Sequence, residues 1–415
     1  MKVSKILLAS MLAAAGASMA FAAPTYIKVT GSTAFRKANI FAICNSLNSP
    51  KAAFVGTAAA DLSGQARAVI RGTLKTGTHQ DVVYQVGLGG SVGGIAGIDA
   101  NQGSVPGASF NGASTWMKDD SVGGGNTLTA VTIGTNSITG ANFIASPAFE
   151  AWSQPKVAFS DSLASSTPFT SNPNVTEVTV GPVGVIDFYW VKGAKHTDVT
   201  TAQYNSLTNI TQQQAAALQK AGILPLSLFT GVAADSAVDV VCVGRNSDSG
   251  TRLAAEAEPQ LGFQAITPNL YRSLGAAVGL DNAWTGFPEV GYDSGAKVAA
   301  DLRVVFNAGV KDENNKPFIL VGYVGKSDKN TAIAGSVAAV LAYNGVTPSD
   351  AGINNGQYSF WTFQHTYHTY TNPTDVAVIA IEAQAAQVLA TDFAQSGISI
   401  GSMAVSRLFE GAPIN

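Results

Sequence analysis

The sequence predicts an α/β fold with parallel-rich sheets, distributed over two or three globular lobes. Short apolar strands alternate with alanine-rich helical segments through most of the chain, as expected for strands covered by helices. With 415 residues, the chain exceeds the size at which a single core usually stops growing. Its 46% hydrophobic and 12% charged residues allow large cores and exclude a disordered polyanion.

The first two strand-to-helix units are clear. Residues 25–30 alternate like a strand, Gly31-Ser32-Thr33 interrupts the alternation, and apolar residues then recur at helical spacing over 35–47. Residues 82–86 predict a second strand, and the glycine-rich turn 87–94 leads into a second helix.

Residues from about 99 to 145 break this alternation. The stretch is rich in Gly, Asn and Ser, and 127–133 could be one strand of a hairpin. We interpret it as an insertion that has little core of its own, and we expect the lobes to fold without it.

The alternation then resumes. A short strand is expected at 156–159, and the long extended run 178–191 could cross from one lobe to the other. A helix at 211–221 precedes a strand at 238–243, the turn 244–250 and a helix that starts near Thr251. For the tail we expect a strand at 358–370, a helix at 375–393 and a last strand at 398–405.

The first 22 residues have the pattern of a secretory signal peptide. Lys2 and Lys5 precede an apolar stretch at 6–15, and Ala20-Phe21-Ala22 provides a small-x-small cleavage site. The stretch is shorter than the roughly 20 residues of a membrane span, and no Cys for lipid attachment follows closely. We therefore expect a periplasmic or secreted protein.

Removing the signal peptide takes away two lysines and no acidic residue, so the formal charge changes from −3 to −5. A nucleic-acid partner would need a basic face, and this charge argues against one. A local site for an anion remains compatible with the net charge.

Cysteines and histidines give no sign of a metal or cofactor. Cys44 lies in an apolar helical pattern and Cys242 in an apolar strand, so two separate buried thiols are favoured over the disulfide that export would permit. His365 and His368, three residues apart in a strand, would point to opposite faces. The sequence has no Gly-x-Ser-x-Gly, His-Glu-x-x-His or P-loop motif, and we expect no enzyme activity.

Three strand-to-helix turns are rich in Gly, Ser and Thr, at residues 31–33, 89–94 and 247–251. Each offers backbone N–H groups at a helix start together with hydroxyl donors, which is the chemistry of an anion site. Ordinary helix capping by Ser, Thr and Asp is the alternative. The nearby Arg245 adds weight to the anion site, but both interpretations stay open.

Four motifs in these turns resemble those of ABC-type phosphate-binding proteins, and they occur in the order found in that family. Arg245-x-x-x-Ser249-Gly250-Thr251 is similar to the Arg-x-x-x-Ser-Gly-Thr motif, and Thr30-Gly31-Ser32-Thr33-Ala34 to the N-terminal turn. The glycine-rich turn with Ser91 resembles the second phosphate loop. Phe159-Ser160-Asp161 resembles the segment that supplies an Asp. The resemblance as a whole extends over most of the mature chain.

This resemblance implies a type II periplasmic-binding fold, in which two α/β lobes joined by two crossovers close around inorganic phosphate. Lobe one would comprise 23–183 and 357–415, including the insertion, and lobe two 184–356. Lobe one would supply donors from Ser32, Thr33, Ala34 and Ser91 and an acceptor from Asp161, and lobe two would supply Arg245, Ser249, Gly250 and Thr251.

Asp161 is the residue that would distinguish phosphate from sulfate. Phosphate at neutral pH carries a proton that it can donate to a carboxylate, whereas sulfate carries none and would leave that carboxylate without a hydrogen bond. The 70 residues between Ser91 and Asp161 exceed the spacing usual in the family, and a surface Asp that caps a turn is the alternative. Arg36, in the first turn of a helix, would either add charge to the site or reach solvent.

We therefore expect a monomeric phosphate receptor that delivers to the membrane subunits of an ABC importer. Two other functions remain compatible with the sequence. One is a binding module for another oxyanion or an organic phosphate. The other is a secreted surface or matrix protein that uses the insertion as its contact element.

Overall fold

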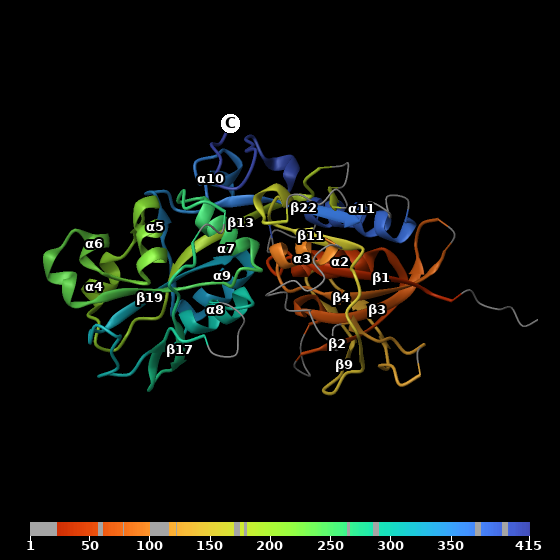
Figure 1. Cartoon of the computed structure of the whole chain (residues 1–415), viewed down its shortest axis with the longest axis horizontal. Helices are drawn as coiled ribbons and strands as arrows, with labels where there is room; N and C mark the ends of the chain where they lie inside the picture. Colours follow the sequence, from red (N-terminus) through yellow and green to blue (C-terminus); the bar gives the residue numbers. More distant parts are fainter. Residues whose placement is uncertain are drawn as a thin grey trace, which may run out of the picture.

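The chain forms two α/β halves that lie side by side (Figure 1). The predicted signal peptide, 1–22, and residues 100–115 of the insertion lie outside the described residues. In the computed structural model, the described residues are 23–56, 61–77, 79–99, 116–121, 123–169, 175–177, 181–263, 266–284, 290–369, 375–391 and 397–415.

A 14-stranded mixed sheet runs through both halves. Parallel pairs occupy the centre of each half, where β1 pairs with β4 and β11, and β16 pairs with β19. The α/β class is confirmed. The sheet is mixed rather than parallel-rich, because β3 pairs with β4, and β2 with β3, in antiparallel orientation. Its main path is β15 (Ile223–Pro225), β16 (Asp239–Val243), β19 (Phe318–Gly325), β13 (Gly184–Lys192), β22 (Trp361–Thr369), β11 (Val157–Ser160), β1 (Thr25–Gly31), β4 (Asp81–Gly87), β3 (Arg67–Leu74), β2 (Leu47–Val55) and β6 (Thr129–Ala130).

Shorter strands lie off this path. β9 pairs with β2, β12 with β22 and β20 with β13, and the others form two-stranded ladders. Their bounds are β5 (Trp116–Met117), β7 (Thr132–Ile133), β8 (Ile138–Thr139), β9 (Asn142–Phe143), β10 (Phe149–Glu150), β12 (Val175–Glu177), β14 (Asn209–Ile210), β17 (Arg272–Gly275), β18 (Gly279–Asp281), β20 (Ala339–Val340) and β21 (Ala342–Tyr343).

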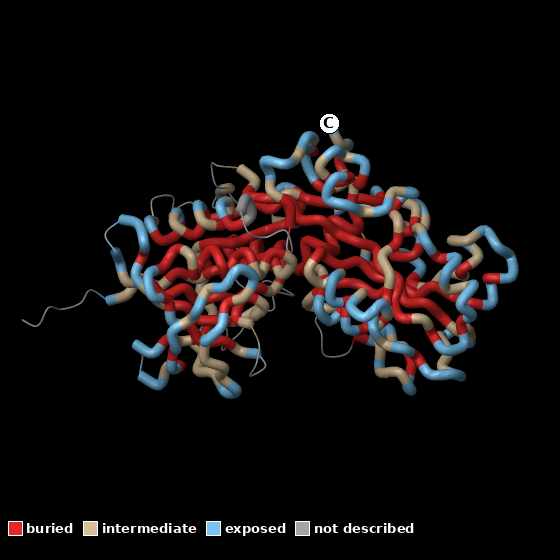
Figure 2. The backbone as a smooth tube through the Cα atoms, turned by 180° about the vertical axis from the view of Figure 1, so that it is seen from behind, coloured by how far each residue is buried: buried red, intermediate tan, exposed pale blue. Residues whose placement is uncertain are grey.

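Two antiparallel strands, β13 and β22, carry the sheet from one half to the other. Residues 184–187 of β13 pair with β22, and residues 188–192 pair with β19 of the second half. Residues 365–368 of β22 pair with β11 of the first half. A single hydrophobic cluster extends from Ile27 in β1 to Val240 in β16, and Figure 2 shows the buried strands continuing across the junction.

Helices cover the faces of both half-sheets. In the first half, α2 packs against α11, and α3 lies on β1 and β11. In the second half, α7, α8 and α9 cover β19. No helix in the described part of the chain combines the length and hydropathy needed to cross a bilayer. Their bounds are α2 (Arg36–Asn45), α3 (Ser91–Ile98), α4 (Thr201–Ser206), α5 (Gln212–Ala221), α6 (Ser227–Thr230), α7 (Gly250–Ala257), α8 (Gly295–Leu302), α9 (Lys326–Ile333), α10 (Asp350–Asn354) and α11 (Val376–Thr391).

Helix α5 illustrates how local chemistry sets these bounds. The Thr211 hydroxyl accepts a hydrogen bond from the Gln214 N–H, and the Gln214 side chain accepts one from the Thr211 N–H. This reciprocal capping box fixes the first turn. The helix ends at Gly222, whose φ of 78° a residue with a side chain rarely adopts.

The insertion packs more tightly than its composition suggested. Trp116 and Met117 are each 1% exposed. Met117 packs with Ala53 and Val69 on one face of the sheet, and the Trp116 indole donates to the Ser153 carbonyl at 3.1 Å. Ile138 is fully buried in the main core. A few large apolar residues therefore anchor the described part of the insertion to the first half, although its composition offers few of them, and whether the lobes fold without it stays a prediction.

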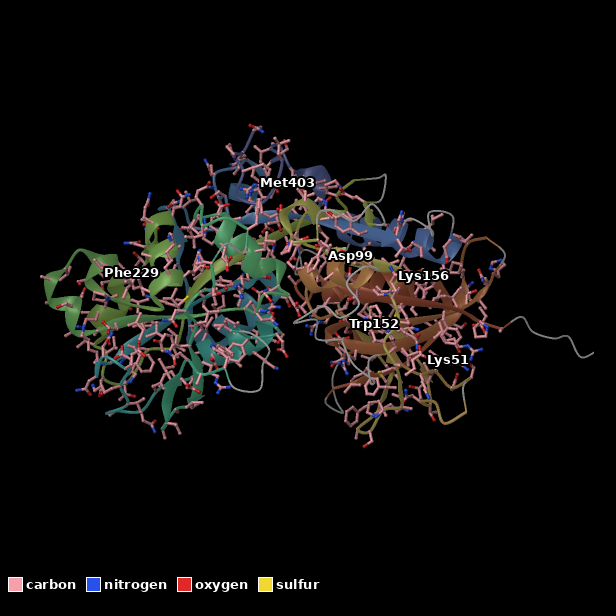
Figure 3. All side chains as sticks on the ribbon, in the orientation of Figure 1. Lys51, Asp99, Trp152, Lys156, Phe229 and Met403 are labelled. Atoms are coloured by element: carbon pink, nitrogen blue, oxygen red, sulfur yellow. The ribbon has the colours of Figure 1, made fainter. Side chains whose placement is uncertain are left out.

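The C-terminal segment also departs from expectation. The predicted last strand over 398–405 is instead a single bridge between Ile398 and Val185, followed by the 3-10 turn η5 (Ile400–Ser402). Further on, Arg407 donates to Glu258 in the second half, and Glu410 accepts a hydrogen bond from the Leu163 N–H in the first. This tail therefore contacts both halves, and Figure 3 places its Met403 above the junction, far from Lys51 in β2.

The two cysteines are buried, and each of the two histidines in β22 lies against a glutamate. Cys44 and Cys242 are buried and do not form a disulfide with each other. His365 lies against Glu177, and His368 lies against Glu382. Within the described residues, no cluster of three or more His, Cys, Asp or Glu side chains is arranged to hold a metal ion.

Trp116 gives a direct test of how far the insertion supports the fold. We expect Trp116→Ala to lower the free energy of unfolding by about 3–5 kcal/mol, because it empties a buried aromatic site. Val278→Ala, at a side chain that is 69% exposed, is the control and should change stability little. Urea unfolding monitored by circular dichroism measures both, and equal stabilities would show that the insertion only rests on the sheet.

Candidate functional site

The glycine-rich turns meet at the junction of the two halves. The turns after β1 and β4 lead into α2 and α3, and the turn after β16 leads into α7 from the other half. Figure 1 shows α2 and α3 facing α7 and α9 there. The N–H groups of Val92 and Gly93, at the start of α3, donate to the Asp248 carbonyl at 3.0 and 3.2 Å. The carboxyl ends of these strands, where α/β proteins usually bind ligands, thus adjoin each other.

The first turn combines capping with a contact to the other half. The Ser32 hydroxyl accepts a hydrogen bond from the Phe35 N–H at 3.2 Å, and the Ser32 N–H donates to the Phe159 carbonyl at 2.7 Å. Thr33 differs, because its hydroxyl accepts a hydrogen bond from Arg245 of the second half at 3.2 Å. Ala34 is half-buried beside them.

Arg245 occupies the centre of the junction. The residue is 2% exposed; its Nε donates to the Tyr292 carbonyl at 3.0 Å, and its Nη2 donates to the Asp293 carbonyl at 3.1 Å. Burial lowers the pKa of Arg245, while Asp328 and Asp161 favour its charged form. These hydrogen-bond acceptors, like the Thr33 hydroxyl, are neutral. A buried cation held by neutral acceptors is a favourable place for an anion.

Asp161 is buried next to Ser91, so it is not the surface cap that was the alternative. It is 1% exposed, its carboxylate accepts a short hydrogen bond from the Ser91 hydroxyl, and its N–H donates to the same hydroxyl at 3.0 Å. Burial raises the pKa of Asp161, while the bond from Ser91 and the charge of Arg245 oppose that rise. The carboxyl group therefore sits where its protonation state depends on what it contacts.

The start of α7 packs against this pair. A Cβ at Gly250 would lie 1.9 Å from the Asp161 carboxylate, so only glycine fits there. The Ser249 hydroxyl caps the helix by accepting from the Arg252 N–H at 3.2 Å, and Thr251 is buried behind it. Helix capping thus accounts for the hydroxyl of Ser249, and a turn hydrogen bond from the Phe35 N–H for that of Ser32. For these two hydroxyls a local structural role is therefore sufficient, whereas Thr33 contacts the other half.

Some N–H groups in the first turns of α3 and α7 form no hydrogen bond with these capping side chains. The hydrogen bonds found in the described part of the chain do not use the N–H groups of Ser91, Gly250 or Thr251. Such groups have no partner within their own helix, and they carry the positive end of the helix dipole. They are available to an additional acceptor.

Sequence reasoning left the role of Arg36 open and gave no role to Asp328. Arg36 turns inward: its Nη1 donates to the Gly64 carbonyl at 2.8 Å, and its Nε is buried with no partner among the described residues. Burial lowers the pKa of Arg36 and raises that of Asp328, and each charge favours the charged form of the other. Arg36 closely follows the glycine-rich turn 31–33, and this position could have indicated its role in the site. Asp328 lies in no recognisable motif.

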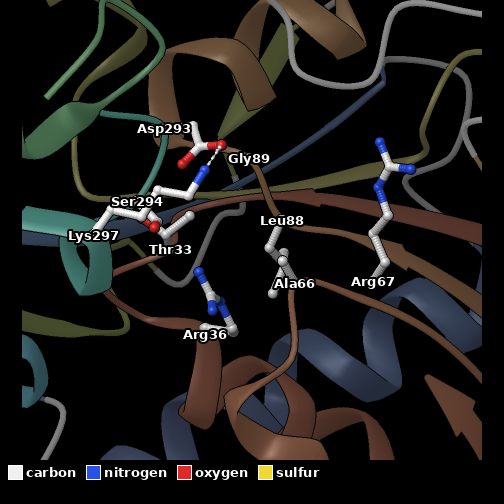
Figure 4. A pocket seen from close by; sticks show the side chains of 9 residues that line it. All are labelled: Thr33, Arg36, Ala66, Arg67, Leu88, Gly89, Asp293, Ser294 and Lys297. Carbon is white, nitrogen blue, oxygen red and sulfur yellow. Dashed lines mark hydrogen bonds and ion pairs between the residues drawn. The ribbon is translucent and has the colours of Figure 1, made fainter. Parts of the chain in front are cut away.

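A pocket of about 300 Å³ opens beside Arg245 and is lined by residues of both halves (Figure 4). Asp293 and Lys297 form an ion pair at 2.8 Å in its wall. In the view of Figure 4, Arg36 and this pair gather near Thr33, while Arg67 stands on the other side of Leu88. The lining residues are Thr33, Arg36, Ala66, Arg67, Leu88, Gly89, Asp293, Ser294 and Lys297.

Comparison with known proteins gives structural likeness only. No protein-family model matches the chain, and no curated protein matches it either. A protein described as a phosphate ABC transporter substrate-binding protein, from Clostridium perfringens with bound phosphate, aligns at 11% identity and a TM-score of 0.42, over 88% of this chain and 93% of its own.

Two further solved structures are similar. PstS from Borrelia burgdorferi aligns at 12% identity and a TM-score of 0.36, over 87% of this chain and 92% of its own. A protein described as phosphate-binding, from Planctomyces limnophilus, aligns at 12% identity and a TM-score of 0.40, over 87% of each chain. These neighbours include phosphate ABC transporter substrate-binding proteins. The likeness is distant, so the assignment of a ligand depends on the geometry of this chain.

Proposed function

We propose that this chain is an exported, two-lobed solute-binding protein that captures inorganic phosphate at the junction of its halves and delivers it to an ABC importer. The observation that carries the proposal is the position of Arg245. Its guanidinium is buried at the junction and contacts Thr33 of the first half as well as Tyr292 and Asp293 of the second. An anion bound there would touch both halves and stabilise their closed arrangement.

The proposed ligand set combines one fixed charge with several neutral donors. Arg245 supplies a forked cation suited to a tetrahedral oxyanion. The N–H groups of Ser91, Gly250 and Thr251 would add hydrogen bonds from two helix starts. The remaining members follow from the sequence motifs: Ser32, Thr33 and Ala34 in the first turn, Asp161 as acceptor and Ser249 at the start of α7.

Asp161 would give the site its preference for phosphate over sulfate. Its carboxylate is buried beside Ser91, where solvent does not satisfy its oxygens. A protonated oxyanion can donate to it, whereas an unprotonated one would place acceptor against acceptor. The proposal therefore includes a binding step and no chemical reaction.

Calorimetric titration of the purified protein with inorganic phosphate, sulfate and chloride is the direct test. We expect saturable binding of phosphate with one ligand per chain, weaker binding of sulfate and none of chloride. A protein that binds no oxyanion, and that associates with itself instead, would favour the surface-protein function.

Arg245 should determine how tightly any oxyanion binds, whereas Asp161 should determine which oxyanion is preferred. We expect Arg245→Ala to weaken phosphate and sulfate together by about 2–5 kcal/mol, because it removes a buried, charge-assisted partner. Asp161→Asn should weaken phosphate only modestly and strengthen sulfate, because an amide can donate to an unprotonated oxygen.

The phosphate-to-sulfate affinity ratio, measured by calorimetry, is the decisive quantity. Lys220→Ala, at an exposed lysine in the last turn of α5, is the control for the loss of positive charge. If Asp161→Asn leaves the ratio unchanged while Arg245→Ala abolishes binding, Asp161 has a structural role only.

Gly250 tests the close approach of the two halves. We expect Gly250→Ala to weaken phosphate by about 1–3 kcal/mol, because its methyl group would overlap the Asp161 carboxylate and push α7 away. Gly64→Ala is the matched control, since a Cβ there meets no atom within 4 Å. Equal phosphate affinities for these two variants would contradict a binding role for the α7 turn.

A further inference from the structure

We propose that the pocket beside Arg245 binds the organic part of a hydroxylated phosphate monoester, so that a polyol phosphate or sugar phosphate is a ligand of this protein. The inference rests on the proposed function. The phosphoryl group would occupy the oxyanion site as its monoanion, which keeps the proton that Asp161 would accept, and the ester oxygen would direct the remainder of the ligand into the pocket.

The pocket shares a wall with the oxyanion site. Arg245 Nη2 donates to the Thr33 hydroxyl and to the Asp293 carbonyl, at 3.2 and 3.1 Å, and both residues line the pocket. A phosphoryl group held by Arg245 would therefore lie at its edge. One ligand could therefore contact Arg245 with its phosphoryl group and place its remainder in the pocket.

The size of the pocket exceeds what orthophosphate can use. Its volume is about 300 Å³, which is at the lower end of the roughly 300–1,000 Å³ typical of small-molecule sites. Ala66 and Leu88 contribute apolar surface from the first half, opposite the polar Ser294 and Lys297 of the second. Such a mixed lining suits a small carbon skeleton that carries polar groups.

The polar groups of the pocket match hydroxyls better than a second anion. Arg36 Nε is a buried donor and Asp293 Oδ1 a buried acceptor, and neither has a hydrogen-bond partner among the described residues. A hydroxyl can accept from the first and donate to the second. A second phosphoryl group would instead face the carboxylate of Asp293, which reduces the benefit of Arg36 and Lys297.

The pocket also explains the inward turn of Arg36. Its side chain spans from α2 to the Gly64 carbonyl, which holds Nη1, and Nε is buried with no hydrogen-bond partner among the described residues. Arg67 is held differently, with its guanidinium 5.4 Å from the centre of the Phe149 ring. The two arginines therefore differ in role, and Arg36 is the one that we assign to the hydroxyl groups.

Titration with phosphate esters beside inorganic phosphate tests this inference separately from the proposed function. Calorimetric titration with glycerol 3-phosphate, glucose 6-phosphate, inorganic phosphate, diphosphate and glucose is the experiment. At a pH of about 5.5, below the second pKa of a phosphate monoester (about 6), each ester keeps one proton for Asp161. There we expect at least one of the two monoesters to bind about tenfold or more tightly than inorganic phosphate, because each hydrogen bond to a charged group can contribute that factor. Glucose alone should not bind, since it lacks the phosphoryl group.

Two variants locate the effect. Ala66→Leu fills the pocket and Lys297→Met removes a donor from its wall. Each should remove most of the monoester advantage while leaving inorganic phosphate within about twofold, because neither residue belongs to the proposed phosphate set. The matched controls are Ala202→Leu and Lys220→Met, at exposed positions of α4 and α5, which should leave both affinities unchanged.

The outcomes are distinct. If inorganic phosphate binds and neither monoester binds more tightly, the inference is wrong and the proposed function stands. Diphosphate that binds more tightly than both monoesters would show that the pocket serves a second anion, which also overturns it. If neither phosphate nor any ester binds to folded protein, as checked by circular dichroism, then the proposed function fails and this inference with it.

Discussion

The burial of one guanidinium group between the two halves is the constraint on which the rest of the site depends. Arg245 follows β16, and hydrogen bonds to Tyr292, Asp293 and Thr33 hold it at the junction. A cation removed from water at such a place is costly unless charge or strong acceptors surround it. The nearby carboxylates of Asp161 and Asp328 reduce that cost, and an oxyanion would reduce it further.

The sheet brings the partners of this guanidinium together. Strands β13 and β22 pair with each other. β13 also pairs with β19 of the second half, and β22 also pairs with β11 of the first, so the two half-sheets share a continuous core. The turns that follow β4 and β16 then meet closely enough for the Asp248 carbonyl to accept hydrogen bonds from the N–H groups of Val92 and Gly93 in α3. Glycine at position 250 is required by the same approach, because any side chain would overlap Asp161.

Amino-acid composition did not predict how a segment packs where a few residues make its contacts. The insertion is rich in Gly, Asn and Ser, yet Trp116, Met117 and Ile138 bury it against the first half. The tail, expected to be a strand, instead reaches both halves through Arg407 and Glu410. In both segments, individual large or charged side chains form the contacts, and average composition does not register them.

The sequence by itself determined the α/β alternation, half of the described helices, strands such as β1, β4, β13 and β22, and the turns with Arg245, because strand period, helix caps and glycine-rich turns are local features. It also supplied every member of the proposed ligand set as a candidate. Only the tertiary structure decided that Asp161 lies beside Ser91 across 70 residues of chain, that Arg36 points inward, and that Asp293 and Lys297 complete a pocket with Thr33. These facts depend on how distant segments pack, and no local pattern of residues encodes that packing.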